Sequence, residues 1–399
     1  MSMSKMEEVP KERLRIAFVV NHINLRGGQE RHAVEHINRF SQRHDVHVFT
    51  SELNDVAQER LAGVTIIPVP LKPFPRYFFE FRRKTSKAIR DAGTFDIIHT
   101  TGGIVEEQNF VAIHYCHKGW EEVLRTKPQA RRGFTPYHKL NLLIAAHYER
   151  RACANPATAG LSACSGRTAD NVSRFYGTAR EKIQVVYNGA DPARFHPDKI
   201  AFREMIRTQY GVPLNSVLFL FVGEYQRKGL NTVLEAMAKI KTNTPFHLLA
   251  VGRGNVPNYM AQAQALGVSD RVTFAGPTSD IEKVFGASDV FVFPTLYEPF
   301  GMVILEAMFT QLPVITSRVA GASELIQHGK NGFLVDDVTD PVAIAAQMDT
   351  VLAMSPEQRE SLGVATRESV LFQTWDRAVG QTETAYFDAL ERQGQQKSR

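Results

Sequence analysis

The chain has 399 residues, a formal net charge of +5 and an isoelectric point near 9.0, with 43% hydrophobic and 22% charged residues. This length and composition predict about two globular domains. The cysteines, Cys116, Cys153 and Cys164, lack C-x-x-C or metal-ligand spacing, so we expect neither a disulfide framework nor a zinc site. No apolar run reaches the roughly 18 residues of a membrane span, and residues 1–15 lack the apolar core of a signal peptide. We expect a cytoplasmic protein, at most peripheral on a membrane.

The first half of the chain alternates short apolar runs with helical segments, which predicts a parallel sheet covered on both faces. The expected strands are 15–20, 45–50, 64–69, 95–99, 110–115, 158–162 and 183–187. The first strand leads into Gly27-Gly28 and then a helix from Glu30. Glycine lets a ligand approach the backbone and a helix N-terminus presents free N–H groups, so this corner is a candidate anion-binding loop.

Histidines mark the ends of two of these strands. His99 ends the fourth strand, and His114 and His117 end the fifth. Ligands of an open α/β sheet bind beyond the carboxyl ends of the strands. We therefore expect the three histidines at one rim of the sheet, where together they indicate a site.

A turn at 188–192 separates this series from a second one, with expected strands at 217–222, 247–251, 271–274, 289–293, 313–316 and 332–335. The predicted organisation is therefore an N-terminal Rossmann-like domain over 1–191 and a C-terminal Rossmann-like domain over 192–375. The helix and tail over 376–399 are expected to pack back toward the N-terminal domain.

Adjacent cations follow the first strand of the second series. Arg227 and Lys228 precede a helix, and Gly252-Arg253-Gly254 closes the next strand in the same manner. Arginine offers a planar fork and lysine a point charge, so the pair could clamp a diphosphate.

Two glutamates frame the next candidate site. Glu298 precedes the helix 302–309, where backbone N–H groups are still free, and Glu306 lies inside that apolar helix, where a carboxylate needs a partner. The six residues from Phe300 to Glu306 rise about 9 Å, whereas the carboxylates of a retaining hydrolase lie roughly 5 to 5.5 Å apart. The spacing favours two ends of one long ligand, although these residues alone equally fit a capping Glu and a core Glu paired with Arg.

The stretch from Glu298 to Glu306 resembles the E-x7-E motif of the GT4 family of retaining glycosyltransferases. Their GT-B fold has two Rossmann-like, doubly wound α/β domains facing across a cleft. Gln226-Arg227-Lys228-Gly229 is similar to the family's diphosphate clamp, and Gly27-Gly28 to its donor-facing glycine loop. One departure is Glu224, where many relatives have arginine. The glycine loop and the position of Arg227 are similar to the branch of lipopolysaccharide core glucosyltransferases.

This resemblance implies a metal-independent hexosyltransferase without a cofactor, which retains the configuration of a sugar supplied as a nucleoside diphosphate sugar, usually of uridine. Glu306 would hold the ribose, Glu298 the sugar, and Arg227 with Lys228 the diphosphate. His114 would orient the sugar, with His117 as the rival candidate. The other implied donor contacts are Gly27, Gly28, Gly252, Phe300, Gly301, Met302 and Val303.

The acceptor would bind to the first domain and the donor to the second. The acceptor could be a lipopolysaccharide, another lipid-linked glycan or a soluble small molecule. A sugar-nucleotide epimerase and a noncatalytic sugar-nucleotide sensor remain open alternatives.

A basic and aromatic stretch, Lys72 to Arg90, predicts contact with an anionic membrane surface on the inner face of the cytoplasmic membrane. It has seven basic residues and the acid Glu80, interleaved with Phe and Tyr, and a second basic stretch covers 125–139. The alternative is a solvated helix whose aromatic side chains pack inward. No recognition motif for nucleic acid accompanies the charge, so no nucleic-acid partner is expected.

Overall fold

A computed structural model describes residues 13–70, 72–131 and 133–397. The ends of the predicted domains, 1–12 and 398–399, and Arg132 of the second basic stretch lie outside the described residues. The chain divides into two compact units. The first comprises Met1–Ile113, Leu143–Ser162 and Val379–Arg399, and the second comprises His114–Leu142 and Ala163–Ala378.

A seven-stranded sheet has the order β5-β3-β1-β6-β7-β8-β9, and its pairs β3–β5, β1–β3, β1–β6 and β6–β7 are parallel. The strands are β1 (Arg15–Val19), β3 (Asp45–Thr50), β5 (Gly63–Ile66), β6 (Ile97–Thr101), β7 (Phe110–Ile113), β8 (Gly160–Ala163) and β9 (Ile183–Val185), and a short parallel pair joins β2 (His22–Ile23) to β4 (Glu52–Leu53).

Alternate side chains of β1 enter two different cores because successive residues of a strand face opposite sides. Ile16 and Phe18 pack with helices α1 (Gly28–Phe40) and α13 (Trp375–Lys397). Ala17 and Val19 pack with α2 (Phe74–Asp91). The first sheet is therefore covered on both faces, as the sequence predicts.

A six-stranded parallel sheet in the second unit has the order β12-β11-β10-β13-β14-β15. Its strands are β10 (Val217–Glu224), β11 (Phe246–Arg253), β12 (Val272–Gly276), β13 (Val290–Phe293), β14 (Val314–Ser317) and β15 (Phe333–Val335). The other helices of the chain are α3 (His117–Thr126), α4 (Pro136–Ala154), α5 (Gly166–Tyr176), α6 (Arg203–Gln209), α7 (Leu230–Met237), α8 (Val256–Ala265), α9 (Ile281–Ala287), α10 (Met302–Phe309), α11 (Pro341–Leu352) and α12 (Pro356–Glu368).

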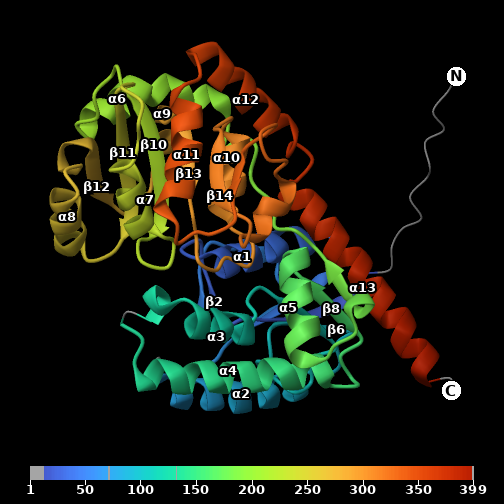
Figure 1. Ribbon diagram of the computed structural model, residues 1–399. Coiled ribbons are helices and arrows are strands. Elements are labelled where there is room, and N and C mark those ends of the chain that lie inside the picture. Colours follow the sequence, from blue (N-terminus) through green and yellow to red (C-terminus); the bar gives the residue numbers. More distant parts are fainter. Residues whose placement is uncertain (1–12, 71, 132, 398–399) are drawn as a thin grey trace, which may run out of the picture. The chain divides into compact units, whose positions relative to one another are not determined.

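Helices cover both faces of this second sheet (Figure 1). Leu218 and Leu220 of β10 belong to a core with α6, α9 and α10, while Phe219 and Phe221 belong to another with α7, α8 and α11. Each predicted strand of both series overlaps an observed strand, so the predicted doubly wound α/β architecture is confirmed.

The chain order reverses between β10 and β13, because β11 and β12 lie on one side of β10 and β14 and β15 on the other side of β13. A doubly wound sheet opens a crevice at the carboxyl ends of the strands at such a switch point. The basic loop, residues 225–229, follows β10, and the glutamate turn, residues 294–301, follows β13. The two predicted halves of the donor site thus lie at one switch point.

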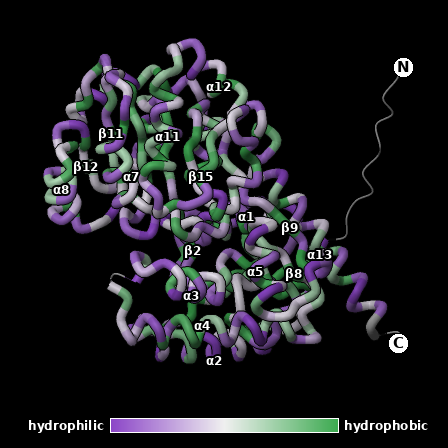
Figure 2. The backbone as a smooth tube through the Cα atoms, viewed as in Figure 1, coloured by the Kyte–Doolittle hydropathy of each residue, from purple (hydrophilic) through white to green (hydrophobic). Residues whose placement is uncertain are grey.

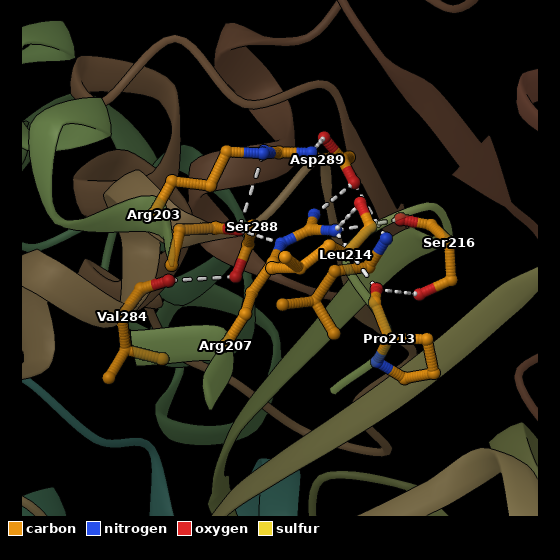
Figure 3. A network of polar contacts seen from close by, with 10 residues as sticks. Arg203, Arg207, Pro213, Leu214, Ser216, Val284, Ser288 and Asp289 are labelled. Atoms are coloured by element: carbon orange, nitrogen blue, oxygen red, sulfur yellow. Dashed lines mark hydrogen bonds and ion pairs between the residues drawn. The ribbon is translucent and has the colours of Figure 1, made fainter. Parts of the chain in front are cut away.

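A buried polar network fixes the opposite, amino-terminal ends of β10 and β13 (Figure 3). Arg207 is fully buried, donates from Nη2 to Asp289 Oδ2 at 2.6 Å, and donates from Nη1 to Ser216 O at 2.8 Å. Arg203 donates to the other oxygen of Asp289 at 2.7 Å, and Leu218 N donates to Asp289 Oδ2 at 2.7 Å. The carboxylate thereby ties the starts of the two switch-point strands together.

Candidate active site

Glu224 shapes the basic loop. Its carboxylate accepts hydrogen bonds from Gln226 N at 3.0 Å and Arg227 N at 2.9 Å. The acidic residue that departs from the family pattern therefore fixes the turn that presents Arg227 and Lys228. Gly229, the residue before α7, has φ +86°, and a Cβ there would lie 2.2 Å from Pro294 O. Only glycine fits this close contact between the basic loop and the glutamate turn.

The glutamate turn is fixed on its other side by the segment after β14. Gly321 N donates to Glu298 O at 2.9 Å, and Ala322 N donates to Phe300 O at 2.6 Å. A Cβ on Gly321 would lie 2.0 Å from Pro299 O, so only glycine allows the two segments to approach this closely. The backbone around Glu298 is thus held by neighbouring strand ends.

The ammonium of Lys228 contacts the carboxylate of Glu298. Their side chains are only 9% and 15% exposed, respectively. Burial lowers the pKa of Lys228, and the negative charge of Glu298 opposes that shift. The ammonium also lies 5.2 Å from the centre of the Phe293 ring. The structure therefore brings together two predicted donor-binding groups that are 70 residues apart in the sequence.

Five further predicted donor residues follow Glu298 in the sequence. Gly301 precedes α10 with φ +97°, Phe300 is buried, and Met302 and Val303 are half-buried in the first turn of the helix. Glu306 is 4% exposed further along α10.

Gly252 pairs in register with Gly223 at the ends of β11 and β10. A Cβ on Gly252 would lie 1.9 Å from Gly223 O, so the two strand ends leave no room for a side chain. Arg227, next to Lys228, is half-buried.

His114 and His117 follow β7, and His117 is the first residue of α3. Burial lowers the pKa of His114 to about 4, so its imidazole is neutral at pH 7. Tyr297, next to Glu298, donates from its hydroxyl to Cys116 O at 2.9 Å and accepts from Cys116 N at 3.3 Å. These hydrogen bonds hold the segment from His114 to His117 against the glutamate turn.

The prediction that His99 joins the other histidines at the rim is wrong. Its side chain is fully buried, stacks on Phe18 with ring centres 4.3 Å apart, and has Nδ1 2.6 Å from the hydroxyl of Tyr386. Strand alternation directs this imidazole into the core between the sheet and α13, so His99 is a structural residue.

Gly27 and Gly28 lie in the first unit, where Gly27 precedes α1. They follow β1 at the switch point of the first sheet, beside β6, and Gln29 Nε2 donates to Thr101 Oγ1 at 2.9 Å across that point. A Cβ on Gly27 would lie 2.1 Å from Glu30 Oε2, so an acidic group lies against the predicted anion loop.

Contacts from α5 to the glutamate turn could not be predicted from the sequence. Ser165 Oγ donates to Pro299 O at 2.6 Å, and Thr168 Oγ1 donates to the same oxygen at 3.2 Å. These partners are more than 130 residues apart. No local pattern marks such a pair.

Glu324 forms a second support of this kind. Its carboxylate accepts from Gly166 N at 2.9 Å and Arg167 N at 2.7 Å, at the N-terminus of α5, and from the Tyr187 hydroxyl at 2.7 Å. Desolvation raises the pKa of Tyr187, and the hydrogen bond from its hydroxyl to the Glu324 carboxylate raises it further.

Within the described ranges, no helix is long and apolar enough to cross a membrane. The described side chains also contain no group of three or more His, Cys, Asp and Glu residues that could hold a metal ion.

Two family models match the chain. Residues 26–194 match "Glycosyltransferase Family 4" and residues 202–369 match "Glycosyl transferases group 1". An uncharacterized glycosyltransferase of Methanocaldococcus jannaschii is 27% identical over 366 residues, which cover 88% of this chain and 91% of that protein. The N-acetyl-alpha-D-glucosaminyl L-malate synthase of Bacillus anthracis is 32% identical over 216 residues, 52% of this chain and 54% of that enzyme. The latter match thus spans about half of the relative.

Solved structures show the same fold. WaaG, a glycosyltransferase involved in lipopolysaccharide biosynthesis, has a TM-score of 0.76 and 21% identity, covering 93% of this chain and 98% of that one. Anabaena HepE in complex with UDP-glucose has a TM-score of 0.67 and 21% identity, covering 93% and 99%. Two doubly wound α/β units with these neighbours define a GT-B glycosyltransferase fold. The chain belongs to glycosyltransferase family 4.

Proposed function

We propose that this protein transfers a hexose from a nucleoside diphosphate sugar, of which uridine is the expected base, to an acceptor hydroxyl with retention of configuration and without a metal ion. The contact between Lys228 and Glu298 at the switch point of the second sheet carries the proposal. In this contact a cation that would bind the diphosphate lies beside a carboxylate that would accept from a sugar hydroxyl. Glu306, buried further along α10, would take the ribose hydroxyls. The HepE complex with UDP-glucose supports the choice of donor for a protein of this fold.

The chemistry requires stabilisation of the negative charge that develops on the departing diphosphate. Positioned cations are most effective at such a point, and Arg227 and Lys228 leave the same turn. The bond from the anomeric carbon to the diphosphate oxygen breaks as the acceptor oxygen attacks from the same face, and a diphosphate oxygen takes the acceptor's proton. His114, neutral at pH 7, would orient the sugar by hydrogen bonding.

We propose that the acceptor is a lipopolysaccharide or another lipid-linked glycan, with a soluble acceptor as the alternative. The similar proteins include both a lipopolysaccharide enzyme and an L-malate synthase. The inner face of the cytoplasmic membrane would then be the place of action.

The surfaces of α2 and α4 support a membrane partner unequally. In α2, Tyr77 and Phe81 pack inward, and five of the seven basic residues of the Lys72–Arg90 stretch pair with acids. These five are Arg76, Arg82, Lys84, Lys87 and Arg90. This favours the solvated helix for most of the stretch, although Phe79 is 46% exposed.

On α4, which carries hydrophobic residues along its length (Figure 2), Tyr137, Leu140 and Leu143 are each more than 40% exposed. Residues three apart share a helix face, so these side chains form an apolar stripe suited to a membrane interface. Co-sedimentation with liposomes of 30% anionic lipid tests this membrane proposal, with Leu140→Ser/Leu143→Ser as the variant. Binding that is unaffected by the variant or independent of anionic lipid would contradict it.

A thermal-shift screen of nucleoside diphosphate sugars tests the donor assignment, because a ligand of the folded state alone must raise the melting temperature. The stabilising sugar nucleotide is then incubated with enzyme and EDTA, with and without acceptor extracts. The proposal expects nucleoside diphosphate release that acceptor stimulates and EDTA leaves unchanged. Conversion of the donor sugar without acceptor would instead indicate the epimerase, and binding without any reaction would indicate a sensor.

A further inference from the structure

The ammonium of Lys228 and the carboxylate of Glu298 neutralise each other. Within the described part of the chain, neither the ammonium nor the carboxylate has another hydrogen-bond or ion-pair partner. Both side chains are largely buried. A buried charge that loses its partner is strongly unfavourable, so any ligand that takes one member of the pair must also provide for the other.

A free nucleoside diphosphate provides only for the cation. Its phosphates can bind Lys228, but they leave the Glu298 carboxylate without a donor and close to a second anion. A complete sugar nucleotide adds hydroxyl groups, which can donate to that carboxylate. Only the ligand that carries the sugar therefore gives both Lys228 and Glu298 a new partner when it separates them.

We propose that Glu298 makes the site selective for the sugar nucleotide over the free nucleoside diphosphate by competing for Lys228 whenever no sugar hydroxyl is present. The inference rests on the proposed function. It also gives the pair a role after transfer. Once the sugar has left, Glu298 takes back the ammonium and weakens the hold on the diphosphate product.

The test measures the affinity of wild type and Glu298→Gln for UDP by calorimetry. Inorganic pyrophosphate serves as a probe that is independent of the base. Glutamine keeps the shape of the side chain and can accept a hydrogen bond from Lys228, but it has no charge. We expect the variant to bind UDP and pyrophosphate at least tenfold more tightly than wild type.

Two controls separate this effect from a change of total charge. Glu360→Gln makes the same charge change on the exposed surface of α12 in the same unit and should leave UDP affinity unchanged. In the double variant Lys228→Met/Glu298→Gln, the gain should disappear. Glu298→Ala is measured in parallel, so that a folding defect of one variant does not decide the result.

Equal or weaker UDP binding by folded Glu298 variants would overturn the inference, as would an equal gain in Glu360→Gln. If neither wild type nor any variant binds UDP, another nucleoside diphosphate or pyrophosphate, the proposed function itself fails. Wild type that binds a sugar nucleotide and UDP equally well would contradict the selectivity alone.

Discussion

Lowering the pH from 7 to 5 should destabilise the second unit through His114. Burial lowers its pKa to about 4 in the folded protein, against 6.5 for an exposed histidine. Between these values the unfolded chain binds more protons than the folded one, so stability falls as the pH drops from 6.5 to 4. From the two pKa values, this side chain alone lowers the free energy of unfolding by about 2 kcal/mol between pH 7 and pH 5.

Urea unfolding of wild type and His114→Gln at both pH values measures this contribution. Both tryptophans of the chain, Trp120 and Trp375, belong to the second unit, so their fluorescence follows its unfolding. The decrease in the free energy of unfolding from pH 7 to pH 5 should be about 2 kcal/mol smaller in the variant than in wild type. NMR titration of the imidazole provides a direct check. A His114 that titrates near 6.5, or a variant with the full pH dependence of wild type, would refute the reasoning.

Three further substitutions test the supports of the structure. Tyr297→Phe removes the hydroxyl that hydrogen-bonds to Cys116 O. Losing a hydrogen bond that contributes about 1 kcal/mol to transition-state stabilisation should lower the transfer rate about fivefold while UDP affinity is retained. An unchanged rate in an acceptor assay would count against this role. Gly229→Ala forces a side chain onto Pro294 O at positive φ and should lower the stability of the second unit by about 1–3 kcal/mol, measured by urea unfolding. Glu383→Gln weakens the contacts of this carboxylate with His44 and Arg43. It should lower the free energy of opening of α13 by about 1–3 kcal/mol and so speed the hydrogen exchange of this helix. Exchange as slow as in wild type would show that these two contacts are dispensable.

The strands could be predicted from the sequence because apolar runs of limited length, bounded by glycine and polar turns, specify buried parallel strands. The predicted helix over Met302–Phe309 coincides with α10. The basic loop and the glutamate turn could be placed at strand ends for the same reason. Their contact through Lys228 and Glu298 then follows from the switch point of the sheet.

The supporting contacts could not be predicted because they join distant segments. Nothing local in the sequence links Ser165 to Pro299 or Tyr297 to Cys116. His99 shows the opposite error, because a histidine at a strand end can face either the rim or the core. The register of the strand and the packing of α13 decide which of the two occurs, and the residues around position 99 determine neither.

Binding of nucleoside diphosphate sugars to wild type and Glu306→Ala tests the central claim most directly. At 100 times the dissociation constant, a ligand of the folded state adds about 2.7 kcal/mol of stability. Wild type should show this stabilisation with at least one sugar nucleotide, and folded Glu306→Ala should lose it. If no sugar nucleotide stabilises wild type, or if Glu306→Ala is stabilised equally, the two glutamates and the basic loop do not form a donor site.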